Sequence, residues 1–202
     1  MPFVFFMLLL YSAFCTAQPP VGRVINSTAN SSVINRGEQQ ITARQRADVA
    51  IGDIIQTRAD ESLLMRMLDS AQITLLCESR FEIKLYPRSQ RLTAVELQLH
   101  RGNLRMIGGN VNAEQFSLIT AVGVLQQERA TFEIIQESPS VLLFGVFAGA
   151  IRLSSPQGEV VQDAASEPRF ISYPQNGMPD ILTREEYTSR RDAACTLAAR
   201  RR

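Results

Sequence analysis

The sequence predicts an all-β domain followed by a C-terminal helix, and three observations carry this prediction. The segments FEIKL at 81–85 and VELQLH at 95–100 alternate apolar and polar side chains, which is the period of a strand with one buried face. Gly102 and Gly149 each reverse such an alternation in the middle of an apolar stretch. Turn sequences containing Gly, Pro, Asp or Ser separate these stretches.

Length and composition fit a single globular domain. The chain has 202 residues, of which 45% are hydrophobic and 20% are charged, and its formal net charge is +1. This apolar content is enough for a real core and excludes disorder of the whole chain. Because the net charge is so small, no long-range field attracts nucleic acid or an anionic membrane, and we expect no nucleic-acid partner.

The N-terminal segment has the pattern of a secretory signal peptide. Residues 2–14 are almost all apolar, and three residues at 15–17 lead from them into a Gln-Pro-Pro sequence. This predicts a signal peptide over residues 1–17, cleavage between Ala17 and Gln18, and a periplasmic or secreted protein with no transmembrane anchor. An uncleaved anchor is disfavoured because a bilayer span needs about 20 apolar residues. Lipidation of Cys15 is a second alternative, disfavoured by the bulky Phe14 before it.

The β-domain is expected to cover residues 18–174, and its first half consists of short strand candidates. Polar or glycine-containing turns lie between them. The loop that follows the first candidate holds two Asn-x-Ser/Thr sequences, which we interpret as loop residues of a bacterial protein. The expected strands occupy residues 21–25, 32–35, 40–43, 54–57, 63–68, 71–77 and 79–86.

The second half contains the two glycines at which the apolar pattern changes parity. Such a change turns the apolar face to solvent unless the strand bulges or bends, and glycine tolerates the bend. We therefore expect GNLRM at 102–106 and GAIRL at 149–153 to be equivalent corners of stacked short strands, in a twisted β-solenoid, a roll or a sandwich. Further strands are expected at 115–122, 130–136, 141–151, 159–162 and 169–173, with residues 123–129 as a connection.

The final segment, residues 175–202, is expected to form a loop and a helix with an arginine-rich tail. Thr183 and Glu186 have the spacing of a capping box, and Leu182 with Tyr187 fits a hydrophobic staple. A helix over about residues 184–199 follows from these signals. Its apolar face is thin, so it would dock weakly unless another bond ties it to the β-domain.

Cys77 and Cys195 are the two cysteines that remain after removal of the signal peptide. In an oxidising compartment they permit one disulfide, which would tie the helix to the β-domain. In the chain-entropy model such a bond stabilises the fold by about 4 to 5 kcal/mol. The alternative is that Cys77, on the apolar face of its strand, is a buried thiol that acts as a small hydrophobic residue. The sequence leaves both alternatives open.

No residue pattern indicates catalysis, a metal or a cofactor. His100 is the only histidine, and the alternation places it on the solvent face of its strand. One histidine and two distant cysteines do not assemble a zinc site of the usual spacing. Phosphate-loop, dinucleotide and nucleophile-elbow motifs are absent from the sequence. Glu78, Glu82 and Lys84 are expected to form a solvated outer stripe.

The order of these segments resembles the FecR domain, the extracytoplasmic module named after the regulator of ferric citrate uptake. One departure is RATF at 129–132, where the family usually has an Arg-Gly-Thr-x-Phe-like turn. The matching segments are VGRV at 21–24, GDIIQT at 52–57, ES at 61–62, MLDSAQI at 67–73, FEIKL at 81–85, LHRGNLR at 99–105, FSLIT at 116–120 and GAIRL at 149–153.

The resemblance implies a non-enzymatic β-domain that mediates protein–protein interaction or sensing in the bacterial cell envelope, with another envelope protein as partner. In the regulators, a cytoplasmic segment controls a sigma factor and a transmembrane helix precedes the sensing domain. This sequence shows neither, so we expect a free-standing module and no direct role as a sigma regulator. The alternative function is a small-ligand or glycan-binding β-domain, for which Phe170 and Tyr173 are the candidate aromatic residues.

Overall fold

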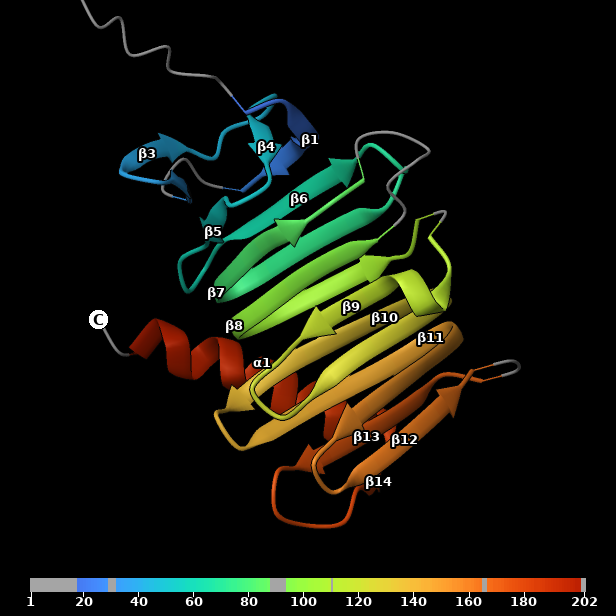
Figure 1. Ribbon diagram of the computed structural model, residues 1–202. Coiled ribbons are helices and arrows are strands. Elements are labelled where there is room, and N and C mark those ends of the chain that lie inside the picture. Colours follow the sequence, from blue (N-terminus) through green and yellow to red (C-terminus); the bar gives the residue numbers. More distant parts are fainter. Residues whose placement is uncertain (1–17, 29–31, 88–93, 110, 165–166, 201–202) are drawn as a thin grey trace, which may run out of the picture.

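The structure is a computed structural model that describes residues 18–28, 32–87, 94–109, 111–164 and 167–200 (Figure 1). Within these residues, fourteen strands form one open sheet and a single α-helix follows them. The predicted all-β class with a C-terminal helix is thereby confirmed. The predicted signal peptide lies outside the described residues, and of its cleavage site they include Gln18 alone.

The strands differ widely in length, from three to fifteen residues. A 3-10 turn, η1, spans Ala113–Gln115, and the helix α1 spans Arg184–Arg200. The strands are β1 (Pro20–Ser27), β2 (Val33–Arg36), β3 (Gln39–Thr42), β4 (Asp48–Ala50), β5 (Ile54–Gln56), β6 (Ser62–Met67), β7 (Gln72–Leu85), β8 (Val95–Ile107), β9 (Phe116–Ile119), β10 (Val124–Ser138), β11 (Val141–Ser155), β12 (Gly158–Asp163), β13 (Arg169–Pro174) and β14 (Asp180–Leu182).

The four longest strands, β7, β8, β10 and β11, bend near their middles. At each bend the backbone has a positive φ: 43° at Cys77 in β7, 90° at Gly102 in β8, 48° at Arg129 in β10 and 69° at Gly149 in β11. Gly102 and Gly149 are therefore corners, as the sequence predicts. They do not separate short strands, however, because each lies within one strand of 13 or 15 residues that continues across the bend.

The bends divide the sheet into two layers, because the two halves of a bent strand have different neighbours. Layer A joins β1 and β6 to the first half of β7, the second halves of β8 and β10, the first half of β11, and then β13 and β14. Layer B begins with β3, β2 and β5, which lead to the second half of β7 and the first half of β8. It continues through β9, the first half of β10 and the second half of β11, and it ends at β12.

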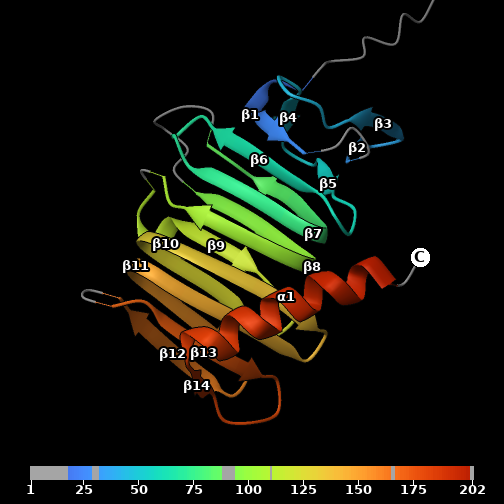
Figure 2. The ribbon, with the colours of Figure 1, turned by 180° about the vertical axis from the view of Figure 1, so that it is seen from behind.

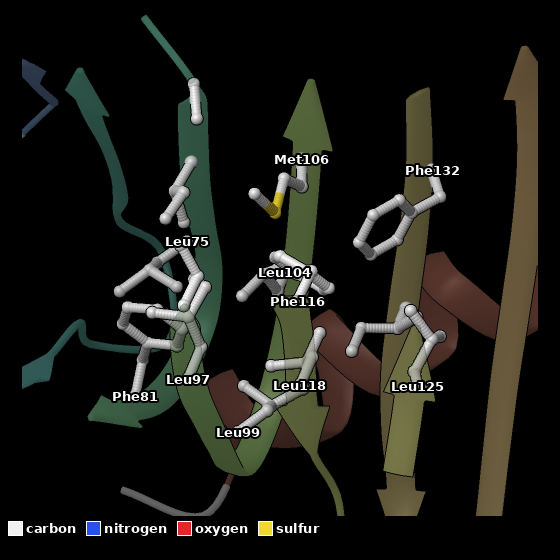
Figure 3. Packing of buried hydrophobic residues seen from close by; sticks show 14 of the residues in the cluster. Leu75, Phe81, Leu97, Leu99, Leu104, Met106, Phe116, Leu118, Leu125 and Phe132 are labelled. Atoms are coloured by element: carbon white, nitrogen blue, oxygen red, sulfur yellow. The ribbon is translucent and has the colours of Figure 1, made fainter. Parts of the chain in front are cut away.

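The main core lies between the two layers. In β7, Leu75 before the bend and Phe81 after it belong to the same cluster, and in β8 the same holds for Leu104 and Leu99 (Figure 3). The change of parity at the corner keeps apolar side chains in this core on both sides of the bend.

Several strands differ from the sequence-based prediction. Residues 71–77 and 79–86, predicted as two strands, are one bent strand, β7. Residues 124–129, predicted as a connection, are the first half of β10, where the buried polar side chain of Gln127 hides the apolar alternation. The segment RATF at 129–132, where the family usually has a turn, is a bulge inside that strand. The strand predicted at 115–122 is shortened to β9, because residue 115 belongs to η1 and residues 120–123 form a turn in which the N–H of Thr120 donates to the Gly123 carbonyl.

Candidate interaction site

Helix α1 begins at a capping box directly after β14. The backbone N–H of Thr183 donates to Glu186 Oε2 at 2.8 Å, and the N–H of Glu186 donates to Thr183 Oγ1 at 3.2 Å. The hydrogen bonds from Thr183 lower the pKa of the Glu186 carboxyl. Leu182 and Tyr187 lie in one apolar cluster, as expected for a hydrophobic staple.

The helix covers the outer face of layer A, from the β14 end of the sheet towards β7 (Figure 2). Tyr187 packs with Ile135, Leu143 and Phe170 in a second apolar cluster, separate from the main core. The ring centroids of Phe170 and Tyr187 are 4.8 Å apart. Gly145 permits this approach, because a Cβ atom there would lie 2.8 Å from the Phe170 ring. One face of the sheet is thus occupied by the protein's own helix.

A buried carboxylate lies beneath α1. Glu133 on β10 is 2% exposed, and its Oε1 lies 4.0 Å from Arg191 Nη1 on the helix. Among the described residues, this oxygen has no hydrogen-bond donor. Burial raises the pKa of Glu133, although Arg191 and Arg105 oppose that shift. The guanidinium of Arg105 in turn lies 5.2 Å from the centroid of the Phe147 ring, in a cation–π contact.

Near the end of α1, the Cys195 sulfur is bonded to the Cys77 sulfur at the bend of β7. The two Cα atoms are 5.1 Å apart, and 118 residues separate the cysteines in sequence. The structure therefore has the first of the two arrangements that the sequence leaves open. Asn103 Nδ2 lies 3.3 Å from Cys195 Sγ, so the bend of β8 also contacts this part of the helix.

A cavity of about 430 Å³ opens beside the disulfide, between α1, the bend of β8 and the hairpin that joins β10 to β11. Its lining includes Cys77, residues 100–103, residues 136–139 and Ala194. His100 is half-buried at this point, and its Nε2 lies 3.0 Å from Glu82 Oε2 on β7. The sole histidine therefore lies in a cross-strand contact with a carboxylate on the outer face of layer B.

The outer face of layer B differs from that of layer A, since no described α-helix lies over it (Figure 1). The predicted charged stripe lies here: Glu82 contacts His100, and Lys84 forms an ion pair with Glu96, with 3.8 Å between Nζ and Oε1. Ion pairs of this kind between neighbouring strands contribute little individually at an exposed surface. They keep this half of the face well solvated.

The other end of layer B is formed by β12, which pairs with β11. Its outward side chains are Glu159, Val161 and Asp163, and Val161 is 51% exposed. Arg152 on β11 reaches Glu159, with 3.4 Å between Nε and Oε1. We call these four residues the β12 site. Beside them, a cavity of about 250 Å³ between η1 and β12 is lined by residues of β10 and β11 as well.

The aromatic residues that the sequence nominates for ligand binding are both buried. Phe170 is 5% exposed beneath α1, and Tyr173 is 2% exposed in the main core, where its hydroxyl lies 2.5 Å from Ser155 Oγ. Neither ring is accessible for stacking on a ligand. The expectation that Phe170 and Tyr173 could bind a ligand is therefore wrong. Successive residues of one strand fill two different cores here, which a single alternation pattern does not reveal.

Two further features concern chemistry and membrane association. Over the described residues, no three His, Cys, Asp or Glu side chains are close enough together to hold a metal ion. In the same part of the chain, no helix has both the length and the apolar character that crossing a membrane requires.

Comparison with known proteins gives one family and one fold. Residues 53–152 match the family described as FecR protein, a stretch that includes both corner glycines. Two crystal structures of a candidate anti-sigma factor from Parabacteroides distasonis ATCC 8503, at 1.65 and 2.50 Å resolution, have a similar fold, with a TM-score of 0.51 for each. Sequence identity is 15% and 14%, and the similarity covers 64% of this chain and 59% of that protein. No curated protein sequence matches this one.

Proposed function

Since this chain is a FecR domain-containing protein, as its resemblance indicated, we propose that it is a non-enzymatic, exported module. It binds another protein of the bacterial cell envelope and takes part in sensing or signalling there. The family is regulatory, and the anti-sigma role given for the structural neighbours is regulatory as well. Protein binding is the activity that such a role requires.

The proposal rests on one structural observation: α1 covers the outer face of layer A but not the outer face of layer B. The outer face of layer A carries apolar side chains, and α1 covers them. The outer face of layer B carries ion pairs over β7 and β8, and then ends in β12 with Val161 half-exposed at the edge. A sheet that covers one face with its own helix and keeps an edge open on the other is suited to docking a partner.

Two further features support export. The apolar run at residues 2–14 has the composition of a signal peptide core. The Cys77–Cys195 disulfide is a bond that persists in oxidising compartments such as the periplasm and is rare in the cytosol.

In vivo cross-linking tests the proposal. A photoreactive amino acid is placed at Val161 on the open side, and as a matched control at Glu185, an exposed residue on α1. We expect the Val161 position to give one adduct with an envelope protein and the Glu185 position to give none. Cross-linking by neither position, together with recovery of the protein in the cytosolic fraction, would contradict both the binding and the export.

A further inference from the structure

We propose that β12 is the docking edge of this module and accepts an extended segment of the partner in which basic residues alternate with apolar ones. The partner segment adds a strand to layer B. This inference rests on the proposed function, because it names the surface and the chemistry through which that binding occurs.

The first argument is the length and regularity of the open edge. Among the described strands that pair on one side alone, β12 has six residues, whereas β3 has four and β4 and β14 have three each. Its pairing with β11 runs from Gly158 to Asp163 without a bulge. The strand contains no lysine or proline, the residues with which edges are commonly protected. Its outer row of N–H and C=O groups is long enough to pair with an added strand.

The second argument is the order of charges along that edge. Glu159, Val161 and Asp163 share the outward face, so the edge presents an acidic, an apolar and an acidic side chain in turn. Arg152 lies next to Glu159, but no cation among the described residues lies within ion-pair distance of Asp163. Side chains directly opposite each other on paired strands interact most strongly, so basic residues on the partner would face the carboxylates and an apolar one Val161.

The third argument is the cavity beside Val161. Glu114 of η1 and Glu128 of β10, both exposed, line this cavity together with Val161. The space of about 250 Å³ accommodates a long side chain. Its two carboxylates outnumber the one cation in the lining, Arg152, and so favour a cationic end.

The same charges disfavour a second copy of this chain as the occupant. If two β12 strands paired antiparallel about Val161, Glu159 of one copy would lie opposite Asp163 of the other at both ends. Like charges directly opposite one another destabilise a strand pair. The edge therefore selects a partner of opposite charge.

Peptide binding to residues 18–202, with the disulfide intact, tests the inference. The probes are two eight-residue peptides, one alternating lysine and valine and the other alternating glutamate and valine. We expect the basic peptide to shift the amide resonances of β12 and to bind at least tenfold more tightly than the acidic one, with an affinity that falls as salt is added. Val161→Lys should weaken this binding at least tenfold, whereas Leu68→Lys, at a residue 61% exposed beyond the end of β6, should leave it unchanged.

Three results would overturn the inference. The first is that the basic peptide leaves the β12 resonances unmoved, and the second is that Val161→Lys, folded as judged by circular dichroism, binds as tightly as the wild type. The third is a dimer in light scattering that Val161→Lys dissociates, because the occupant would then be a second copy. The binding function would survive these results if cross-linkers elsewhere on the surface still captured an envelope protein, and it would fail if none did.

Discussion

Gly102 of β8 packs directly against Ser79 of β7. A Cβ atom at Gly102 would lie 2.5 Å from Ser79 Cα, and the glycine has a φ of 90°. The Ser79 hydroxyl accepts a hydrogen bond from the N–H of Asn103 at 2.9 Å. The bends of the two strands are therefore locked together by backbone proximity, and only a residue without a side chain fits at this corner.

Replacing Gly102 by alanine should destabilise the fold by about 2 to 3 kcal/mol, because the strained backbone and the contact with Ser79 act together. Gly37→Ala is the matched control, since Gly37 also has a positive φ, 57°, but a Cβ atom there would have no other atom within 4 Å. Gly37→Ala should lower the free energy of unfolding by about 1 kcal/mol, because only the strain of the positive φ applies there. Urea unfolding measures both values, and equal losses would refute the close contact as the cause.

Removing the disulfide between β7 and α1 should lower the stability of the fold more than Gly102→Ala does. Cys77→Ala combined with Cys195→Ala should lower the free energy of unfolding by about 4 to 5 kcal/mol in the chain-entropy model, since the closed loop is long. Ala193→Ser, on the same helix, is the control for a small polar change and should have little effect. Thiol labelling of residues 18–202, denatured but not reduced, should find no reactive cysteine, and labelling of both Cys77 and Cys195 would disprove the bond.

The bends show which part of the fold follows from the sequence. Gly102 and Gly149 mark their corners visibly, because a parity change at a glycine has one simple explanation. Cys77 and Arg129 adopt positive φ values of 43° and 48° without being glycines, so their corners carry no such signal. As a result, β7 reads as two strands and the first half of β10 reads as a loop. Both errors involve tertiary pairing that imposes an unusual backbone conformation on an ordinary residue, and in β10 the buried polar side chain of Gln127 also hides the alternation.

The interaction site is harder to predict from the sequence than the fold is, for a different reason. Residues 159–162 are predictable as a strand, but whether that strand lies at an edge depends on the order of strands in the sheet, which alternation does not encode. β4 and β14 have three residues each, too few for any period. The capping box at Thr183 and Glu186 is predictable because it is local, whereas the burial of Glu133 under α1 depends on a helix that begins some fifty residues later.

Glu133→Gln should stabilise the protein at neutral pH by about 1 kcal/mol, since burying a charge without a full set of hydrogen bonds is costly. The pKa of Glu133 is raised in the folded state, so its protonated form contributes stability that is complete below the unfolded pKa and is lost as pH rises through the folded pKa. The advantage of the variant should therefore shrink as pH falls.

Unfolding free energies measured from pH 4 to pH 8 test this expectation. Glu137→Gln is the control, since Glu137 lies on the same strand, is about one-third exposed and pairs with Arg190. Because water reaches Glu137, Glu137→Gln should not stabilise the protein at neutral pH. If Glu133→Gln gave no stabilisation at neutral pH either, Glu133 would not be a buried, charged group in the folded protein.

Asp53, in the turn before β5, holds the start of layer B in place through its buried carboxylate. Arg36 Nε donates to Asp53 Oδ1 at 2.8 Å, Arg36 Nη2 donates to Oδ2 at 2.7 Å, and the N–H of Ala50 also donates to Oδ2 at 2.8 Å. Asp53→Asn replaces one acceptor oxygen by an amide group that is itself a donor and that would face one or two of these three donors. It should therefore cost about 2 to 4 kcal/mol, because one partner of a buried ion pair is removed.

Asp48→Asn is the matched control, since the carboxylate of Asp48 is 45% exposed where it pairs with Arg23. Exposed pairs of this kind contribute less than about 1 kcal/mol. Both variants remove one negative charge. The ratio of their losses in unfolding free energy, measured with urea, therefore reports the effect of burial. A loss at Asp53 no larger than that at Asp48 would mean that water reaches the Arg36 pair, and that the turn at residues 52–53 depends on Gly52, with its φ of 82°, and not on its aspartate.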